Sequence, residues 1–289
     1  MFRRVAIVGL GLIGGSIGLA LHTSKAAQEI TGFDLGAGVC AHARKMGAID
    51  LPCGSLADTV RGAELVILAT PVGAMRTLLQ SVAPALSPGA VVTDVASTKA
   101  QVINWAEEFL PETVSFVGGH PMAGKEVSGV AASDAGLFHN RIYCLTPTAR
   151  TRSEAVSKVT TLVELLGARL RFLEPAEHDG LVAGVSHLPF LAAIALMETV
   201  VSNPTWGDAS PLASTGFRDV TRLAAGSPEM YRDICLTNSA AVTRWLDEYI
   251  ETLQQLRQRV ATHDRSMEKL FVRAQQSRQQ WSATQDGLD

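Results

Sequence analysis

The sequence has little of what metal-binding, disulfide-stabilised or nucleic-acid-binding proteins need. Its 289 residues include four cysteines, and their spacing forms neither a metal-binding cluster nor a disulfide framework: Cys40, Cys53, Cys144 and Cys235. We therefore predict no metal site and unpaired thiols in a reducing cytoplasm. The net charge of −3 leaves no basic surface for DNA or RNA, so a nucleic-acid partner is not expected.

Long hydrophobic runs are also scarce, and two of them need an explanation. Residues 5–21 read VAIVGLGLIGGSIGLAL behind two arginines, as a signal peptide or a membrane anchor would. No small-residue cleavage site follows, and the glycines are regularly spaced, which favours a nucleotide site. Residues 180–201 contain His187, Pro189 and Glu198, so we interpret this run as a buried core helix and expect no membrane partner.

The glycines of the first run form a dinucleotide-binding pattern. They follow G-x-G-x-x-G where the short strand VAIV passes into a helix, and Asp34 follows 20 residues after Gly14. One glycine makes the turn, one lets the backbone approach a pyrophosphate, and one lets the helix pack on the strand. The start of the helix then offers free N–H groups to phosphate. The predicted phosphate-binding residues are Gly9, Gly11, Leu12, Ile13 and Gly14.

The acidic residue predicts which dinucleotide binds. A carboxylate at the end of the second strand accepts both ribose hydroxyls and repels a 2′-phosphate, so Asp34 favours NAD, with NADP as the alternative. The third strand ends in ATPV, which places Thr70 and Pro71 along the path of the cofactor.

The order of apolar runs predicts an α/β fold. Runs at 63–71, 89–97, 115–121, 141–147 and 168–174 alternate with helical stretches, which indicates a parallel sheet covered on both faces. After Glu174 only helical periodicity remains, and residues 236–281 read as one long helix or a helix pair ahead of a frayed end at 282–289. We predict a Rossmann-type dinucleotide-binding domain at 1–174 and an all-α substrate and dimerisation domain at 175–289.

Two strand ends carry side chains suited to catalysis. Ser97 ends the apolar run at 89–97 and is followed by Thr98 and Lys99, and His120 lies near the end of the run at 115–121. Ligands bind beyond the carboxyl ends of strands in such sheets. Taken alone, Ser97 fits the N-cap of the next helix, and a lone histidine at such a position is structural about as often as it is catalytic. A serine and a histidine together above a nucleotide site favour catalysis.

Six motifs carry a resemblance to a known family. In order along the chain they are GLGLIGGSIG, DVASTK, GGHPMAG, LTPT, SHLPF and GFRDVTRLA. With them the chain resembles the prephenate/arogenate dehydrogenases of tyrosine biosynthesis, from the first strand to about residue 240. The resemblance implies a dinucleotide domain followed by a helical dimerisation domain, and thus a homodimer.

The resemblance also implies a reaction and roles. A cyclohexadienol, arogenate or prephenate, is oxidised at C4, hydride passes to NAD(P)⁺, and CO₂ leaves as the ring becomes aromatic. His120 matches the base that takes the proton of the 4-hydroxyl. Ser97 matches the serine that orients this histidine or hydrogen-bonds the hydroxyl. Arg222 matches the arginine that holds a substrate carboxylate. Arg218 lies on the same helix face as Arg222 if the segment is helical, or has a structural role. His187 either reaches the active site from the second domain or packs within a helix.

One departure bears on the substrate. Some members of the family read S-H-L-P-H, where this chain has Phe190. The stretches HPMAGKEV and SHLPF look most like the arogenate-using members, which favours arogenate, with prephenate preference or dual specificity as the alternative.

Two other kinds of protein compete with this interpretation. A β-hydroxyacid-type dehydrogenase usually needs a catalytic lysine on its helical domain, and residues 175–250 contain none. A non-catalytic NAD-binding sensor needs Gly9, Gly11, Gly14 and Asp34 but has no use for a serine, a histidine and an arginine at the substrate side.

Overall fold

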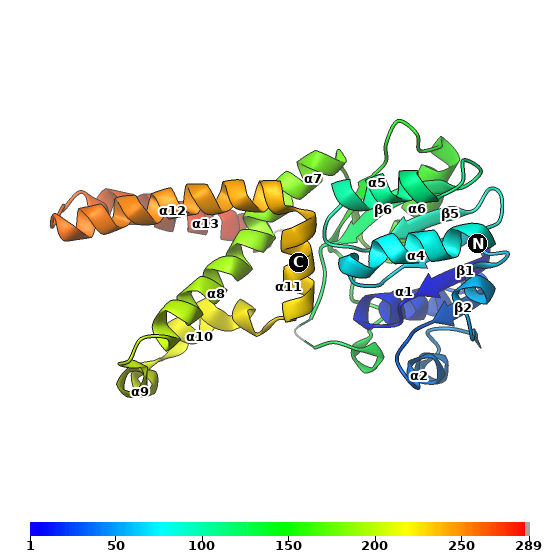
Figure 1. Cartoon of the computed structure of the whole chain (residues 1–289), viewed down its shortest axis with the longest axis horizontal. Coiled ribbons are helices and arrows are strands. Elements are labelled where there is room, and N and C mark those ends of the chain that lie inside the picture. Colours follow the sequence, from blue (N-terminus) through cyan, green and yellow to red (C-terminus); the bar gives the residue numbers. More distant parts are fainter. Residues whose placement is uncertain (126, 287–289) are drawn as a thin grey trace. The chain divides into compact units, whose positions relative to one another are not determined.

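An eight-stranded sheet forms the centre of the first part of the chain (Figure 1). The computed structural model describes residues 1–125 and 127–286. Its strand order is β3-β2-β1-β4-β5-β6-β7-β8. The strands are β1 (Phe2–Val8), β2 (Ala27–Phe33), β3 (Leu51–Pro52), β4 (Leu65–Leu68), β5 (Val91–Asp94), β6 (Ser115–Pro121), β7 (Ile142–Thr146) and β8 (Arg169–Phe172). The predicted class, a Rossmann-type sheet domain followed by helices, is confirmed.

The prediction of a parallel sheet is wrong at one strand. Pairs from β3 to β6 are parallel, but β7 runs antiparallel to β6, with His120 opposite Cys144. β8 then pairs with β7 in parallel. The apolar run at 141–147 does not encode direction, because a strand buried on both faces looks the same in either orientation.

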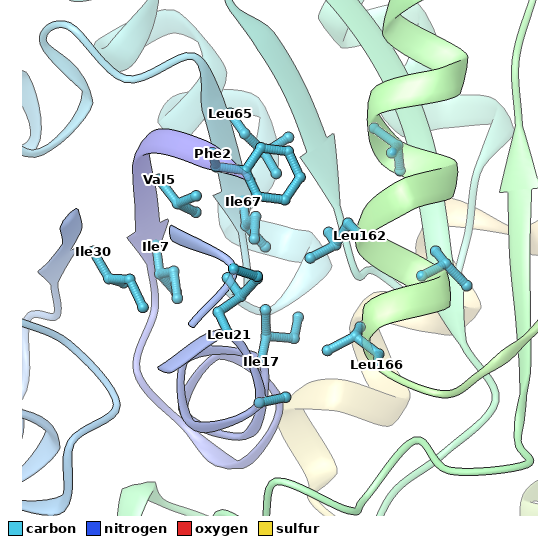
Figure 2. Close-up of a cluster of buried hydrophobic side chains, with 14 of the residues drawn as sticks. Phe2, Val5, Ile7, Ile17, Leu21, Ile30, Leu65, Ile67, Leu162 and Leu166 are labelled. Carbon is cyan, nitrogen blue, oxygen red and sulfur yellow. The ribbon is translucent and has the colours of Figure 1, made fainter. Parts of the chain in front are cut away.

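Alternating side chains bury the sheet on both faces. Six helices flank it: α1 (Leu12–Thr23), α2 (Val39–Met46), α3 (Leu56–Val60), α4 (Met75–Val82), α5 (Ala100–Phe109) and α6 (Ser153–Leu165). Short turns of helix lie at η1 (Val72–Ala74), η2 (Ala83–Ala85) and η3 (Val130–Ala132). Figure 2 shows one face, where Val5 and Ile7 of β1 lie in the same cluster as Ile17 of α1 and Leu162 of α6. Ala6 of β1 packs with α4 and α5 on the other face, as the period-2 geometry of a strand requires.

Beyond the sheet the described chain is helical to Asp286. The elements are α7 (Pro175–Val182), η4 (Ala183–His187), α8 (Leu188–Val201), α9 (Trp206–Ala209), η5 (Ser210–Leu212), α10 (Thr215–Thr221), η6 (Arg222–Ala225), α11 (Pro228–Thr237), α12 (Ser239–Ala261) and α13 (Met267–Asp286). Residues 236–281 thus contain a helix pair, preceded by the end of α11. The end expected to fray is helical to Asp286, and residues 287–289 lie outside the described chain.

Backbone contacts divide the chain into two units, Met1–Ser239 and Ala240–Asp289. The helices α7 to α11 therefore belong to the same compact unit as the sheet. The domain boundary at 174/175, between β8 and α7, stays a prediction.

The second hydrophobic run does not form the buried core helix that we expected. Residues Pro175–Val201 are long and apolar enough to cross a membrane by length and composition, and 28% of their most apolar 18-residue window is buried. In α8 the buried residues are Phe190 and Ala193. Most of the other residues of α8 are half-buried, and an apolar helix that keeps this much surface in a single chain is the kind of surface that a partner covers.

Candidate functional site

A cleft of about 560 Å³ opens beyond the carboxyl ends of β1 and β4. Strand order reverses between these two strands, which is where nucleotides bind in doubly wound sheets. Gly9 makes the turn out of β1 with φ of +91°, and a Cβ there would lie 2.4 Å from the carbonyl oxygen of Ala69. A Cβ on Gly11 would meet no atom within 4 Å, so this backbone faces open space in the cleft.

The predicted phosphate-binding residues divide into three groups. Gly9 and Gly11 line the cleft. Gly14 instead serves packing, because a Cβ there would lie 2.0 Å from the carbonyl oxygen of Gly9. Leu12 and Ile13 are the first two residues of α1, where N–H groups have no partner within the helix and can bind an anion.

Asp34 follows β2 and lines the same cleft. Its Oδ2 accepts from the backbone N–H of Leu10 at 2.8 Å, and its Oδ1 accepts from that of Gly36 at 2.7 Å. These two bonds orient the carboxylate and tie it to the glycine turn. Each oxygen keeps a further lone pair, so the carboxylate can still accept from ribose hydroxyls.

Thr70 and Pro71 line the opposite wall of the cleft, after β4. The Oγ1 of Thr70 is buried and has no hydrogen-bond partner among residues 1–125 and 127–286, and such a group usually has a bound molecule or water as its partner. The open backbone at Gly11, the available lone pairs of Asp34 and this hydroxyl together fit a dinucleotide.

Ser97 lies half-buried just after β5, three residues before the first residue of α5. Ser97 is therefore not the N-cap of α5, which was its alternative role in the sequence. Lys99 occupies the capping position without a side-chain cap bond. The carboxylate of Asp179 takes that place from α7, accepting from the N–H groups of Lys99 at 2.7 Å and Ala100 at 2.9 Å.

His120 lies buried near the end of β6 and contacts a second histidine. Its Nδ1 is 2.9 Å from Nε2 of His178, whose Nδ1 is 2.9 Å from Oδ1 of Asp179. Burial first, and then the charges of His178, Lys99 and His187, hold the pKa of His120 well below its ordinary value. A neutral imidazole at neutral pH is the form that accepts a proton.

Sequence reasoning missed His178 and Asp179. The signal was an adjacent His-Asp pair in EPAEHDG, at the start of the first helix after the sheet. Nothing in that local sequence shows that the pair reaches a strand end 58 residues earlier.

A buried ion pair lies beneath this site. Lys99, expected at the mouth, is fully buried and pairs with Asp94 of β5. Its Nζ also donates to the carbonyl oxygen of Gly119 at 2.7 Å, and Oδ1 of Asp94 accepts from the N–H of Gly119 at 3.0 Å. The pair thus fixes the backbone directly before His120.

His187 ends a π-helical turn, Ala183–His187, between α7 and α8. Such turns are rare and frequently mark functional sites. Its Nδ1 is 3.4 Å from the amide nitrogen of Asn238, and its buried Nε2 has no hydrogen-bond partner in the part of the chain that the structure describes. Burial lowers the pKa of His187 to about 4, so the ring is neutral at pH 7. Its effect on the pKa of His120 places the two histidines in one neighbourhood.

The predicted arginines lie on exposed turns of the helical segment. Arg222 begins η6, and Arg218 lies in α10. The charge of Arg222 acts on the phenol of Tyr231, whose pKa burial raises. The Tyr231 ring stacks on Phe190 with centroids 3.9 Å apart, and Phe190 lies 6.0 Å from His187. Two aromatic rings thus connect the Arg222 region to His187.

Metal-binding groups do not gather in the described residues. Among residues 1–125 and 127–286, no three histidine, cysteine or acidic side chains are placed to hold an ion. The segment HPMAGKEV includes Glu126, which lies outside the described residues.

Comparison with known proteins gives matches along nearly the whole chain. The family model described as "Prephenate dehydrogenase, nucleotide-binding domain" matches residues 17–172, and the one for the prephenate dehydrogenase dimerization domain matches residues 174–276. Prephenate dehydrogenase from Bacillus subtilis (strain 168) is 38% identical over 273 residues, which are 94% of this chain and 73% of that protein.

Two crystal structures resemble the whole fold. Prephenate dehydrogenase from A. aeolicus, in complex with hydroxyphenyl propionate and NAD⁺, matches with a TM-score of 0.90 and 30% identity over 97% of this chain and 98% of that one. Synechocystis arogenate dehydrogenase matches with a TM-score of 0.83 and 30% identity over 96% of this chain and 100% of that one.

Proposed function

Because the chain belongs to the prephenate dehydrogenase family, we propose that it oxidatively decarboxylates arogenate or prephenate with NAD⁺. The resemblance predicted from the sequence motifs is confirmed. The observation that carries the proposal is the position of His120. This neutral, buried histidine lies near the carboxyl end of β6, and the cleft that fits a dinucleotide opens at the same sheet edge, beyond β1 and β4.

The residues of the chain supply proton transfer and orientation. Bound NAD⁺ supplies the hydride acceptor in this chemistry. His120 accepts the proton of the 4-hydroxyl as hydride leaves C4 and CO₂ leaves the ring, and Ser97 hydrogen-bonds that hydroxyl. Aromatisation drives the reaction, so the protein has mainly to position the substrate and take one proton. The products are tyrosine from arogenate or 4-hydroxyphenylpyruvate from prephenate.

Arg222 holds a substrate carboxylate in this proposal. A guanidinium binds a carboxylate through two parallel hydrogen bonds and so fixes its orientation. The aromatic stack of Phe190 and Tyr231 connects this arginine to His187, which contributes a neutral ring to the substrate pocket. Arg218 is a further candidate for substrate binding, on α10 just before η6.

Substrate choice, cofactor choice and assembly are also proposals. Phe190 offers no polar atom to a keto acid, and with the similarity to an arogenate dehydrogenase this favours arogenate. Asp34 favours NAD over NADP. The match to a dimerization domain supports a homodimer, and the four free thiols suit the cytoplasm.

The test is turnover by the purified protein. Arogenate and prephenate are each supplied with NAD⁺ and with NADP⁺, and reduced cofactor is followed by its near-ultraviolet absorbance. We expect turnover with NAD⁺ and a higher kcat/KM for arogenate. Equal turnover of both substrates would make the enzyme dual-specific and remove the argument from Phe190.

Two variants separate the roles within that assay. His120→Gln is expected to lower kcat roughly 10²- to 10⁴-fold while NAD⁺ still binds in a calorimetric titration. Arg222→Gln is expected to raise KM about 10- to 100-fold, the cost of one charge-assisted hydrogen bond. Binding of NAD⁺ without turnover of either substrate would instead favour the non-catalytic sensor.

A further inference from the structure

Asp179 is held in one orientation by backbone and side-chain donors. Its carboxylate accepts from the N–H groups of Lys99 and Ala100 at the start of α5. The amide of Asn238 donates to its backbone carbonyl at 2.8 Å. Asp179 is 4% exposed and His178 is fully buried, so neither side chain can turn to solvent for another partner.

This orientation determines which nitrogen of His178 carries hydrogen. A carboxylate only accepts hydrogen bonds, so the 2.9 Å contact with Asp179 requires hydrogen on Nδ1 of His178. In the neutral ring Nε2 is then an acceptor. For this neutral His178 ring, the 2.9 Å contact between its Nε2 and Nδ1 of His120 assigns the hydrogen to Nδ1 of His120.

We infer that His178, oriented by Asp179, is a positioning residue that holds His120 with its Nε2 lone pair free for the substrate proton. The inference rests on the proposed function for its catalytic meaning, but the tautomer itself belongs to the protein without ligands. The rings meet edge-on, with centroids 5.1 Å apart and planes at 69°, a geometry that is compatible with a hydrogen bond between an in-plane lone pair and a ring N–H.

The hydrogen-bonded series from His120 through His178 to Asp179 also compensates the charge that forms during turnover. When Nε2 of His120 takes a proton, the ring becomes a cation near buried Lys99, which disfavours it, and near His187, which is neutral. The Nδ1–H of His120 points through His178 toward the carboxylate of Asp179, which is the negatively charged end of this hydrogen-bonded series. His178 therefore links the site of proton transfer to its counter-charge.

Nitrogen-15 NMR of histidine-labelled protein without substrate tests the tautomer directly. We expect the His120 signals, assigned by their loss in His120→Gln, to show hydrogen on Nδ1 and none on Nε2 at pH 7. Substituting His178→Leu should shift His120 toward the Nε2–H form. Hydrogen on Nε2 of His120 in the unaltered protein would overturn the inference, whatever the enzyme's activity.

Kinetics of a matched pair of variants test the consequence. The Leu substitution removes the acceptor, and kcat should fall roughly 10- to 100-fold, within the range of general-base effects, with KM and NAD⁺ affinity changed less than about twofold. His178→Gln places an amide oxygen near the lost Nε2 and should recover most of kcat. Equal kcat values for the two variants would contradict the role of His178. Absence of turnover in the unaltered protein would instead contradict the proposed function and leave the NMR result standing.

Discussion

At the scale of single residues, the neutral state of His187 has a consequence for stability. Burial lowers its pKa from 6.5 to about 4 in the folded protein. The unfolded chain therefore binds more protons between these values, so the contribution is complete above pH 6.5 and is lost as pH falls toward 4. His120 acts in the same direction.

We expect acid to destabilise the protein partly through His187. Between pH 7.5 and pH 5 its share of the loss is about 2 kcal/mol in the free energy of unfolding, measured by urea denaturation. His187→Asn should reduce the loss by that amount, whereas His42→Asn, on the exposed surface of α2, should leave it unchanged. Equal pH dependence in His187→Asn and the unaltered protein would contradict the buried, neutral state.

Local spacing is enough to predict where some site residues lie, while their roles stay predictions. The positions of Gly9, Gly11 and Asp34 in the cleft follow from a turn between one strand and one helix and from the end of the next strand. His178 and Asp179 were not predicted, because their role depends on contacts with His120 and the start of α5. Only the packing of α7 against the sheet edge creates those contacts.

At the scale of elements, the ends of β5 and β6 are held together by a buried ion pair. Lys99 and Asp94 are both fully buried, and both also bond the backbone of Gly119. Removing one partner of such a pair leaves a buried charge without compensation, which costs about 3–5 kcal/mol. The position of His120 depends on this junction.

Lys99→Met is therefore expected to lower the free energy of unfolding by about 3–5 kcal/mol in urea denaturation. The double variant Lys99→Met/Asp94→Asn removes both charges and should recover part of that loss. The exposed pair of Arg76 and Glu108 offers a control, since Arg76→Met should change stability by less than about 1 kcal/mol. An unchanged urea midpoint for Lys99→Met would contradict the argument.

Element-level prediction located the strands but not all of their directions. Apolar runs mark β1, β4, β5 and β6 because parallel strands buried on both faces are apolar throughout. The two-residue β3 carries too little pattern to detect, and the reversal at β7 is decided by the chain between His120 and Ile142. The π-helical turn that ends at His187 lies in an apolar stretch whose sequence does not distinguish it from α-helix.

At the scale of the whole molecule, apolar side chains remain exposed in the helical part of the single chain. Val185 is 73% exposed in the segment before α8. Within the second unit, described by itself, exposed apolar side chains include Ile250, Leu253, Val260, Phe271 and Trp281. Monomeric proteins rarely expose so many large apolar groups together, and the matching family model is a dimerization domain.

A homodimer that covers α12 would bury its exposed apolar residues Ile250, Leu253 and Val260, and a matched pair of variants tests it. Leu253 and Gln254 are neighbours in α12, one apolar and one polar, and both are exposed. Leu253→Glu places a charge where an apolar contact is expected and should weaken dimerisation at least about tenfold, because an unpaired buried charge costs well over 1.4 kcal/mol. Gln254→Glu introduces the same charge and should leave the dimer intact. Light scattering after size-exclusion chromatography measures both. A monomer in the unaltered protein, or equal dimerisation in the two variants, would show that these apolar side chains of α12 have another purpose.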